Sequence, residues 1–111
     1  MNLRNRVQLI GNMGKNPVVK ELNNGGKMAR FSLATNEFTV KDGERVKETQ
    51  WHTLVAWGKT ADIVAEHMQT GAEVMVGGRL KNRSYTDDKG NTRYITEVVV
   101  DEVLFRNRQA A

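Results

Sequence analysis

The segment from Trp51 to Gly58 constrains the fold most strongly, because as a strand it would carry apolar side chains on both faces. Successive side chains of a strand point to opposite faces, so Trp51 and Trp57 would share one face. Leu54 and Ala56 would then lie on the other face. Two apolar faces indicate a central strand, yet a small single-layer barrel has only one interior. Either the tryptophans belong to the core or they stand outside a barrel, and this segment alone leaves both interpretations open.

The remaining sequence predicts several more strands and a single helix. Alternating apolar and polar positions predict strands over residues 3–10, 18–22, 27–40, 45–57, 73–87 and 92–105. Residues 11–15 share some features with a phosphate-binding loop, but we interpret them as a turn, because a proline and no helix follows. From Ala61 the apolar spacing becomes helical, with Thr60 as the expected N-cap and Gly71 as the terminating residue.

This order of elements predicts the fold class. An all-β chain of about five strands, with one helix between the third and fourth, is typical of the five-stranded Greek-key barrel called the OB fold, which binds oligonucleotides and oligosaccharides. A small sandwich is the alternative that periodicity leaves open. The 111 residues suit one domain, which we expect to span residues 1–106, with 107–111 as a short C-terminal remnant.

Composition narrows the classes of function. Seventeen Lys and Arg against thirteen Asp and Glu give a net charge of +4, which favours an anionic partner without identifying it. The sequence has no cysteine, which excludes disulfides and thiolate metal sites and fits a cytosolic protein. No apolar run is long enough to predict a membrane span or the core of a signal peptide, so no membrane partner is expected.

The clearest pattern of functional side chains is a basic row on the strand predicted over 73–87. The row consists of the alternate residues Arg79, Lys81, Arg83 and Tyr85, which would share one face. Cations that follow a phosphate backbone and end at an aromatic ring suit the binding of single-stranded nucleic acid. Charges can instead protect a strand against edge pairing, but the absence of an acid from this row favours binding. Arg6 and Lys59 could extend the basic surface.

Catalysis and metal binding find little support in the sequence. His52 and His67 have no paired-histidine spacing, and no cysteine could complete a metal site. The acidic pair Asp87 and Asp88 is better explained by a turn than by an ion. We therefore expect no enzyme activity, no metal and no cofactor.

Four stretches resemble the bacterial-type single-stranded DNA-binding proteins. They are NRVQLIGNMG at 5–14, FSLATN at 31–36, ETQWHTLVAWGK at 48–59 with the following residues 61–62, and 78–100, which runs from GRLKNRSYTDDKG to RYITEVVV. Together they cover nearly the whole chain in the order found in the family. The resemblance implies an OB-fold barrel, usually assembled as a homotetramer. Such proteins bind and protect unpaired DNA without sequence preference during replication, recombination and repair, on the nucleoid in the cytoplasm.

The same resemblance implies which residues contact DNA. Base-stacking rings fall on Trp51, Trp57 and Tyr85, which favours tryptophans outside the barrel. Basic DNA-binding positions fall on Lys59, Lys81, Arg83 and Arg6, to which the row adds Arg79. One stacking tryptophan of the family is absent, and Thr39 occupies or adjoins its place. The neighbouring Phe38 is kept as a candidate, although strand alternation would point it to the other face.

Expected partners and alternative functions complete this interpretation. Family members usually continue into a flexible linker and an acidic tip that recruits replication and repair proteins, whereas this sequence stops at Ala111. Those partners are therefore expected only if the full-length protein carries such a tail. The alternatives are an RNA-binding or primosome-type OB-fold protein, a structural assembly module with its tryptophans in a protein interface, and a small nuclease.

Overall fold

The computed structural model describes residues 3–105, which form six strands and one helix. The predicted remnant at 107–111 lies outside these residues. In chain order the elements are β1 (Val7–Met13), β2 (Val18–Glu21), β3 (Lys27–Lys41), β4 (Glu44–Trp57), α1 (Gly58–His67), β5 (Glu73–Thr86) and β6 (Thr92–Phe105).

The strands close into a barrel because β1 has two neighbours. The sheet order is β1-β5-β6-β4-β3-β2, and β1 also pairs with β3. That second pairing places Asn12 opposite Ala34 and Met13 opposite Leu33, which joins the two ends of the sheet. The short strand β2 is an appendage on β3, so five strands form the barrel itself. The predicted five-stranded barrel with its helix after the third barrel strand is therefore confirmed, and the sandwich is excluded.

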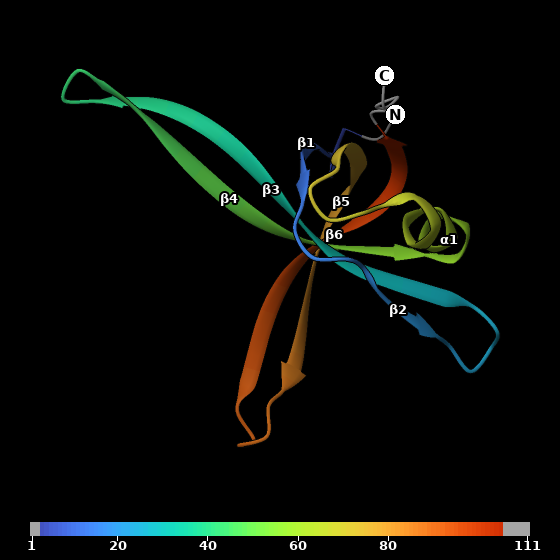
Figure 1. The fold of residues 1–111 in the computed structure, drawn as a ribbon. Helices are drawn as coiled ribbons and strands as arrows, with labels where there is room; N and C mark the ends of the chain where they lie inside the picture. The colour runs from blue at the N-terminus through green and yellow to red at the C-terminus, as the bar shows by residue number, and fades with distance from the viewer. Residues whose placement is uncertain (1–2, 106–111) are drawn as a thin grey trace.

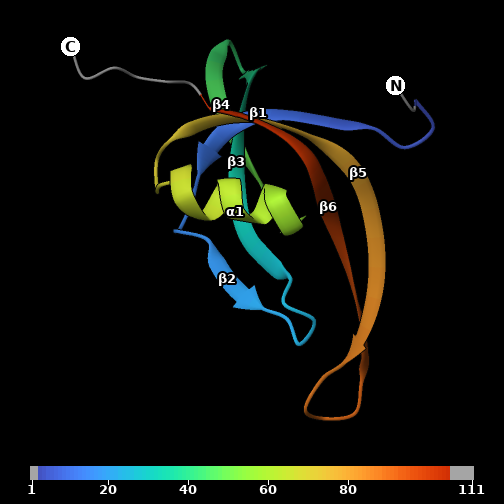
Figure 2. The ribbon, with the colours of Figure 1, turned by 90° about the vertical axis from the view of Figure 1, so that its right-hand side faces the viewer.

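One face of each barrel strand and one side of α1 fill the interior. Leu54 and Ala56 have no exposed surface, whereas Trp51 and Trp57 are 63% and 48% exposed. The helix packs across the barrel and buries Ala61 and Val64 (Figure 2). The buried cluster comprises Met13, Ala29, Phe31, Leu33, Leu54, Ala56, Ala61, Val64, Met68, Val74, Val76, Val98 and Val100. The tryptophans are therefore outside the barrel, and the core interpretation is wrong.

Two long hairpins extend from the barrel in different directions (Figure 1). The β3–β4 ladder continues without interruption to the pair Lys41 and Glu44, and the β5–β6 ladder continues to Thr86 and Thr92. In the second turn the Asp87 carboxylate accepts hydrogen bonds from the backbone N–H groups of residues 89 and 91, at 3.0 and 2.9 Å. The predicted turn at Asp87 is confirmed, and the hairpins carry their outer side chains well beyond the barrel.

Two glycines lie where strands approach too closely for a side chain. A Cβ atom on Gly11 would lie 2.2 Å from the carbonyl oxygen of Ala34, where β1 crosses from β5 to β3. A Cβ atom on Gly78 would lie 2.1 Å from the carbonyl oxygen of Val99. The register of β5 and β6 shifts between Gly77 and Gly78, so this glycine pair marks a β-bulge, as glycines inside a strand commonly do.

Element boundaries differ from the sequence predictions at β1 and α1. Residues 11–13 belong to β1 and are not a turn, because both β5 and β3 offer them partners. The helix begins at Gly58 and has Trp57 as its N-cap without a side-chain hydrogen bond, so the prediction of Thr60 as the cap is wrong. The helix ends at His67 rather than continuing to Gly71, which has a positive φ of 86° in the following turn. Strand β4 thus runs directly into the helix through Gly58, whose φ is 60°.

Candidate nucleic-acid interface

The strand register places the predicted aromatic and basic residues on one face of the sheet. Residues directly opposite each other on paired strands share a face. Strand β4 connects to β6 through Val55 opposite Val99, and β6 connects to β5 through Val99 opposite Arg79. By alternation along β4 and β5, this face, called the outer face below, carries Trp51, Thr53, Val55, Trp57, Arg79, Lys81, Arg83 and Tyr85.

Three of the four predicted stacking residues are the exposed rings Trp51, Trp57 and Tyr85. The exposed fraction of Tyr85 is 47%, close to that of Trp57. Gly14, just after β1, leaves room for the Trp51 ring, since a Cβ atom there would lie 2.8 Å from Cζ3 of the indole. These rings lie on two different hairpins, so a nucleic-acid chain that contacts all of them would cross the barrel.

Phe38 also lies on the outer face, so its predicted orientation toward the other face is wrong. It pairs directly with Lys47, and the same ladder pairs Ala34 with Trp51, so the even-numbered residues of β3 accompany the odd-numbered residues of β4. The Phe38 ring is 54% exposed. The guanidinium of Arg45 lies over it, with Cζ 4.1 Å from the ring centroid, which is a cation–π contact. Phe38 therefore supplies a fourth exposed ring on the tryptophan side, near the end of the β3–β4 hairpin.

The predicted basic residues differ in how they are held. Lys59, Arg79 and Lys81 are exposed. Arg6 instead pairs with both carboxylate oxygens of Asp101 at 3.0 and 3.1 Å, and lies 3.5 Å from the carboxylate of Glu102. The guanidinium of Arg6 thus has two acidic neighbours, and its contact with phosphate remains a prediction.

Arg83 belongs to a triad with Arg30 and Glu97. Its Nε and Nη2 donate to the Glu97 carboxylate at 2.8 and 3.3 Å, while Nη2 of Arg30 donates to the same carboxylate at 3.1 Å. Glu97 is only 4% exposed. The hydrogen bonds from Arg83, assisted by the charges of both arginines, lower the pKa of Glu97 although burial opposes this. The carboxylate therefore stays ionised beneath the outer face.

Sequence reasoning missed several charged residues of the outer face. Alternation backward from Trp51 through β4 reaches Lys47 and Arg45, so the pattern that identified the tryptophans could have identified these two cations. No local pattern pairs Arg30 with Glu97, which lies on a strand far along the chain. Their contact depends on the parallel pairing of β4 and β6, a tertiary feature.

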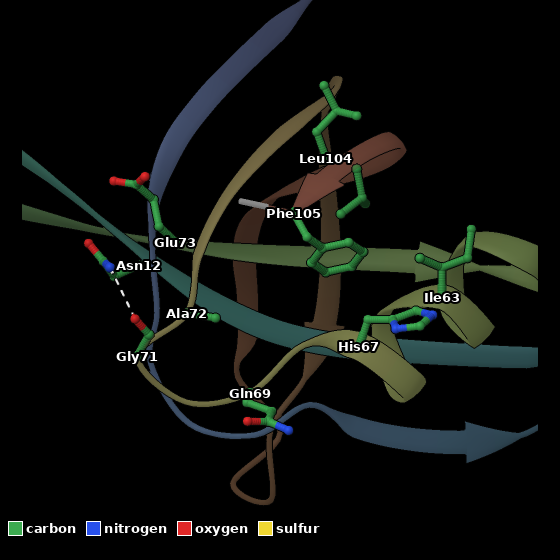
Figure 3. A pocket seen from close by; sticks show the side chains of 10 residues that line it. Asn12, Ile63, His67, Gln69, Gly71, Ala72, Glu73, Leu104 and Phe105 are labelled. Carbon is green, nitrogen blue, oxygen red and sulfur yellow. Dashed lines mark hydrogen bonds between the residues drawn. The ribbon is translucent and has the colours of Figure 1, made fainter. Parts of the chain in front are cut away.

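One large hollow of the molecule involves none of the predicted stacking rings. It has a volume of about 1010 Å³ and lies beside the end of α1 (Figure 3). The rings of His67 and Phe105 meet there, with centroids 5.6 Å apart. It is lined by Asn12, Ile63, His67, Gln69, Gly71, Ala72, Glu73, Val103, Leu104 and Phe105. The exposed rings and cations of the outer face therefore lie apart from this hollow.

The described histidines and acids can be examined as candidates for a metal site. His52 Nε2 lies 2.9 Å from the hydroxyl of Thr35, which makes it a hydrogen-bonded, half-buried residue. Within residues 3–105, no three His, Asp or Glu side chains come together as metal ligands would. Over the same range, no helix has the length and apolar character needed to span a membrane.

A closed OB-fold barrel with aromatic rings and cations on an open outer face defines a class of protein, the OB-fold binders of single-stranded nucleic acid. The sequence model of a protein family, the Single-strand binding protein family, matches residues 4–106. The chain belongs to this family, which confirms the resemblance seen in the sequence. Among solved structures, the chain is similar to the Plasmodium falciparum SSB complex with ssDNA, with a TM-score of 0.85 and 33% identity over 96% of this chain and 100% of that chain.

Proposed function

We propose that this protein binds single-stranded DNA without sequence preference and protects it during replication, recombination and repair. The observation that carries the proposal is the outer face, where four exposed rings accompany a basic row. Membership of the family and similarity to a protein solved in complex with single-stranded DNA support it. The RNA-binding and assembly-module alternatives are not favoured.

The mechanism follows from the chemistry of the outer face. Trp51, Trp57, Tyr85 and Phe38 stack on unpaired bases, and stacking accepts every base because each has a π face. Lys59, Arg79, Lys81 and Arg83 hold phosphates and release the counterions of the strand. A duplex keeps its bases stacked on each other, so it gives these rings nothing to bind. The process needs no cofactor, and we expect no catalysis.

We further infer that the protein works as a homo-oligomer, a tetramer in the usual form of the family, on the nucleoid in the cytoplasm. A protomer with a net charge of +4 attracts a polyanion weakly, and several copies on one strand overcome that weakness. Recruitment of replication and repair proteins depends on whether the full-length protein carries an acidic tail.

Titration with oligo-thymidine tests the proposed function. Stacking on exposed indoles will quench tryptophan fluorescence. A plot of log binding constant against log salt concentration will have a slope of about −0.7 for each phosphate neutralised. Oligonucleotides of increasing length, followed by fluorescence and mass, will report the site size and the oligomeric state together. Equal affinity for duplex DNA or RNA at the same salt would contradict the proposal. A fluorescence change that follows dilution instead of oligonucleotide would identify the tryptophans as interface residues.

The two tyrosines of the β5–β6 hairpin provide a matched test of the outer face. Tyr85 lies on the outer face, whereas Tyr94 pairs with Ser84 and lies on the opposite face, 81% exposed. We expect Tyr85→Ala to weaken oligo-thymidine binding by about 5- to 150-fold, the loss of one stacked base at roughly 1–3 kcal/mol. Tyr94→Ala should change affinity less than about twofold, since no stacked base is lost. Equal losses in the two variants, measured by fluorescence titration, would show that the outer face is not the binding surface.

A further inference from the structure

Among residues 3–105, the outer face contains one buried carboxylate, that of Glu97 on β6, which lies beside the basic row of β5. Glu97 is the register partner of Lys81 and accepts hydrogen bonds from Arg83 and Arg30, whose side chains are 38% and 37% exposed. The two guanidinium groups thus cover the carboxylate and reach the surface above it. A phosphate that approaches Arg83 would meet the negative charge of Glu97 directly behind the cation.

Stability alone does not explain an ionised group at this position. A buried ion pair stabilises a fold poorly, because the desolvation of the charges offsets their attraction. The neighbouring outer-face residues of β4 and β6, Val55 and Val99, are apolar, so an apolar residue would suit position 97. Burial also leaves Nε of Arg30 without a hydrogen-bond partner. The triad therefore retains an unfavourable arrangement on the surface proposed to bind DNA.

We propose that Glu97 limits the affinity of the outer face for single-stranded DNA by withholding one positive charge from the phosphate backbone. Arg83, Arg30 and Glu97 together carry one net positive charge, whereas the two arginines without the carboxylate would carry two. The hydrogen bonds of Arg83 to Glu97 also make the carboxylate compete with phosphate for the same guanidinium group. Binding remains more readily reversible as a result. This inference rests on the proposed function.

Glu97→Gln tests the inference because it removes the charge and preserves the shape of the side chain. One additional effective cation should make the slope of log binding constant against log salt concentration steeper by about 0.7. Oligo-thymidine binding should then be roughly eightfold tighter at about 50 mM salt, and the difference should disappear near 1 M. Glu66→Gln is the control, since it makes the same change of charge at an exposed position on α1. Its affinity and salt slope should match those of the wild type. An unchanged or weakened affinity in Glu97→Gln would overturn the proposal.

A double variant keeps the test decisive if Glu97→Gln does not fold. Arg83→Gln alone removes a cation and leaves the carboxylate, so binding should weaken and the salt slope should become shallower by about 0.7. Arg83→Gln with Glu97→Gln leaves no unpaired carboxylate, and its salt slope and affinity should return close to those of the wild type. If the double variant binds as weakly as Arg83→Gln, Glu97 does not reduce the positive charge available to the phosphate backbone. Absence of oligo-thymidine binding by the wild-type protein would contradict the proposed function itself, so the two failures are distinguishable.

Discussion

Replacing both Trp51 and Trp57 by alanine will weaken oligo-thymidine binding by roughly 30-fold to 25,000-fold, because two stacked bases are lost at about 1–3 kcal/mol each. The barrel should remain folded, since both rings lie outside the core that Leu54 and Ala56 help to form. The variant has no tryptophan left, so binding must be followed by the anisotropy of a labelled strand. Circular dichroism will report whether the strands and the helix persist.

Phenylalanine at both positions is the matched control for this experiment. Phe retains a flat ring with less area, so the double Phe variant should bind between the wild type and the double Ala variant. Unfolding of the alanine variant would mean that the indoles stabilise the core. Wild-type affinity in a folded alanine variant would mean that the outer face does not bind bases.

The second large effect concerns closure of the barrel. Gly11→Ala should reduce the free energy of unfolding by about 3 kcal/mol or more, because the added methyl group would meet the backbone of β3 where the strands cross. Backbone atoms in a hydrogen-bonded ladder cannot move aside without breaking the pairing of β1 with β3. Urea unfolding at one fixed protein concentration measures the change, and that concentration matters because an oligomer gains stability by mass action.

Gly77→Ala is the control for the glycine prediction. Its Cβ atom would meet Nη2 of Arg6, the far end of a flexible side chain that can shift while it keeps its exposed acidic partners. We expect a loss of less than about 1 kcal/mol, since the side chain that the new methyl group meets can move, whereas the backbone beside Gly11 cannot. Similar losses in Gly11→Ala and Gly77→Ala would contradict the view that the crossing of β1 and β3 requires glycine.

Local sequence patterns predicted most of the strands and the contents of their faces. Alternation along 73–87 groups Arg79, Lys81, Arg83 and Tyr85, and the structure places all four on one face. The β-bulge at Gly77 and the turn at Asp87 also follow from single residues and their neighbours. These features were predictable because strand period and turn chemistry depend on a few adjacent residues.

The alternation of side chains within one strand does not predict how that strand is paired with its neighbours. Whether Phe38 or Thr39 faces the tryptophans depends on how the β3–β4 hairpin pairs, and its turn at residues 42–43 determines that pairing. A shift of one residue would exchange the two side chains between faces. The same reason explains the boundary of β1, whose last residues are strand only because β3 lies beside them.

The sequence by itself determined that this chain is a set of strands with one helix, with rings and cations grouped on single faces. Only the tertiary structure decided which face is inside, because the choice between Leu54 and Trp51 depends on the closure of β1 onto β3 and the packing of α1. It alone brought Arg30 to Glu97, residues on strands far apart in sequence that a parallel pairing connects. Side-chain period is a property of neighbouring residues, whereas an interior and a long-range ion pair exist only after distant strands have met.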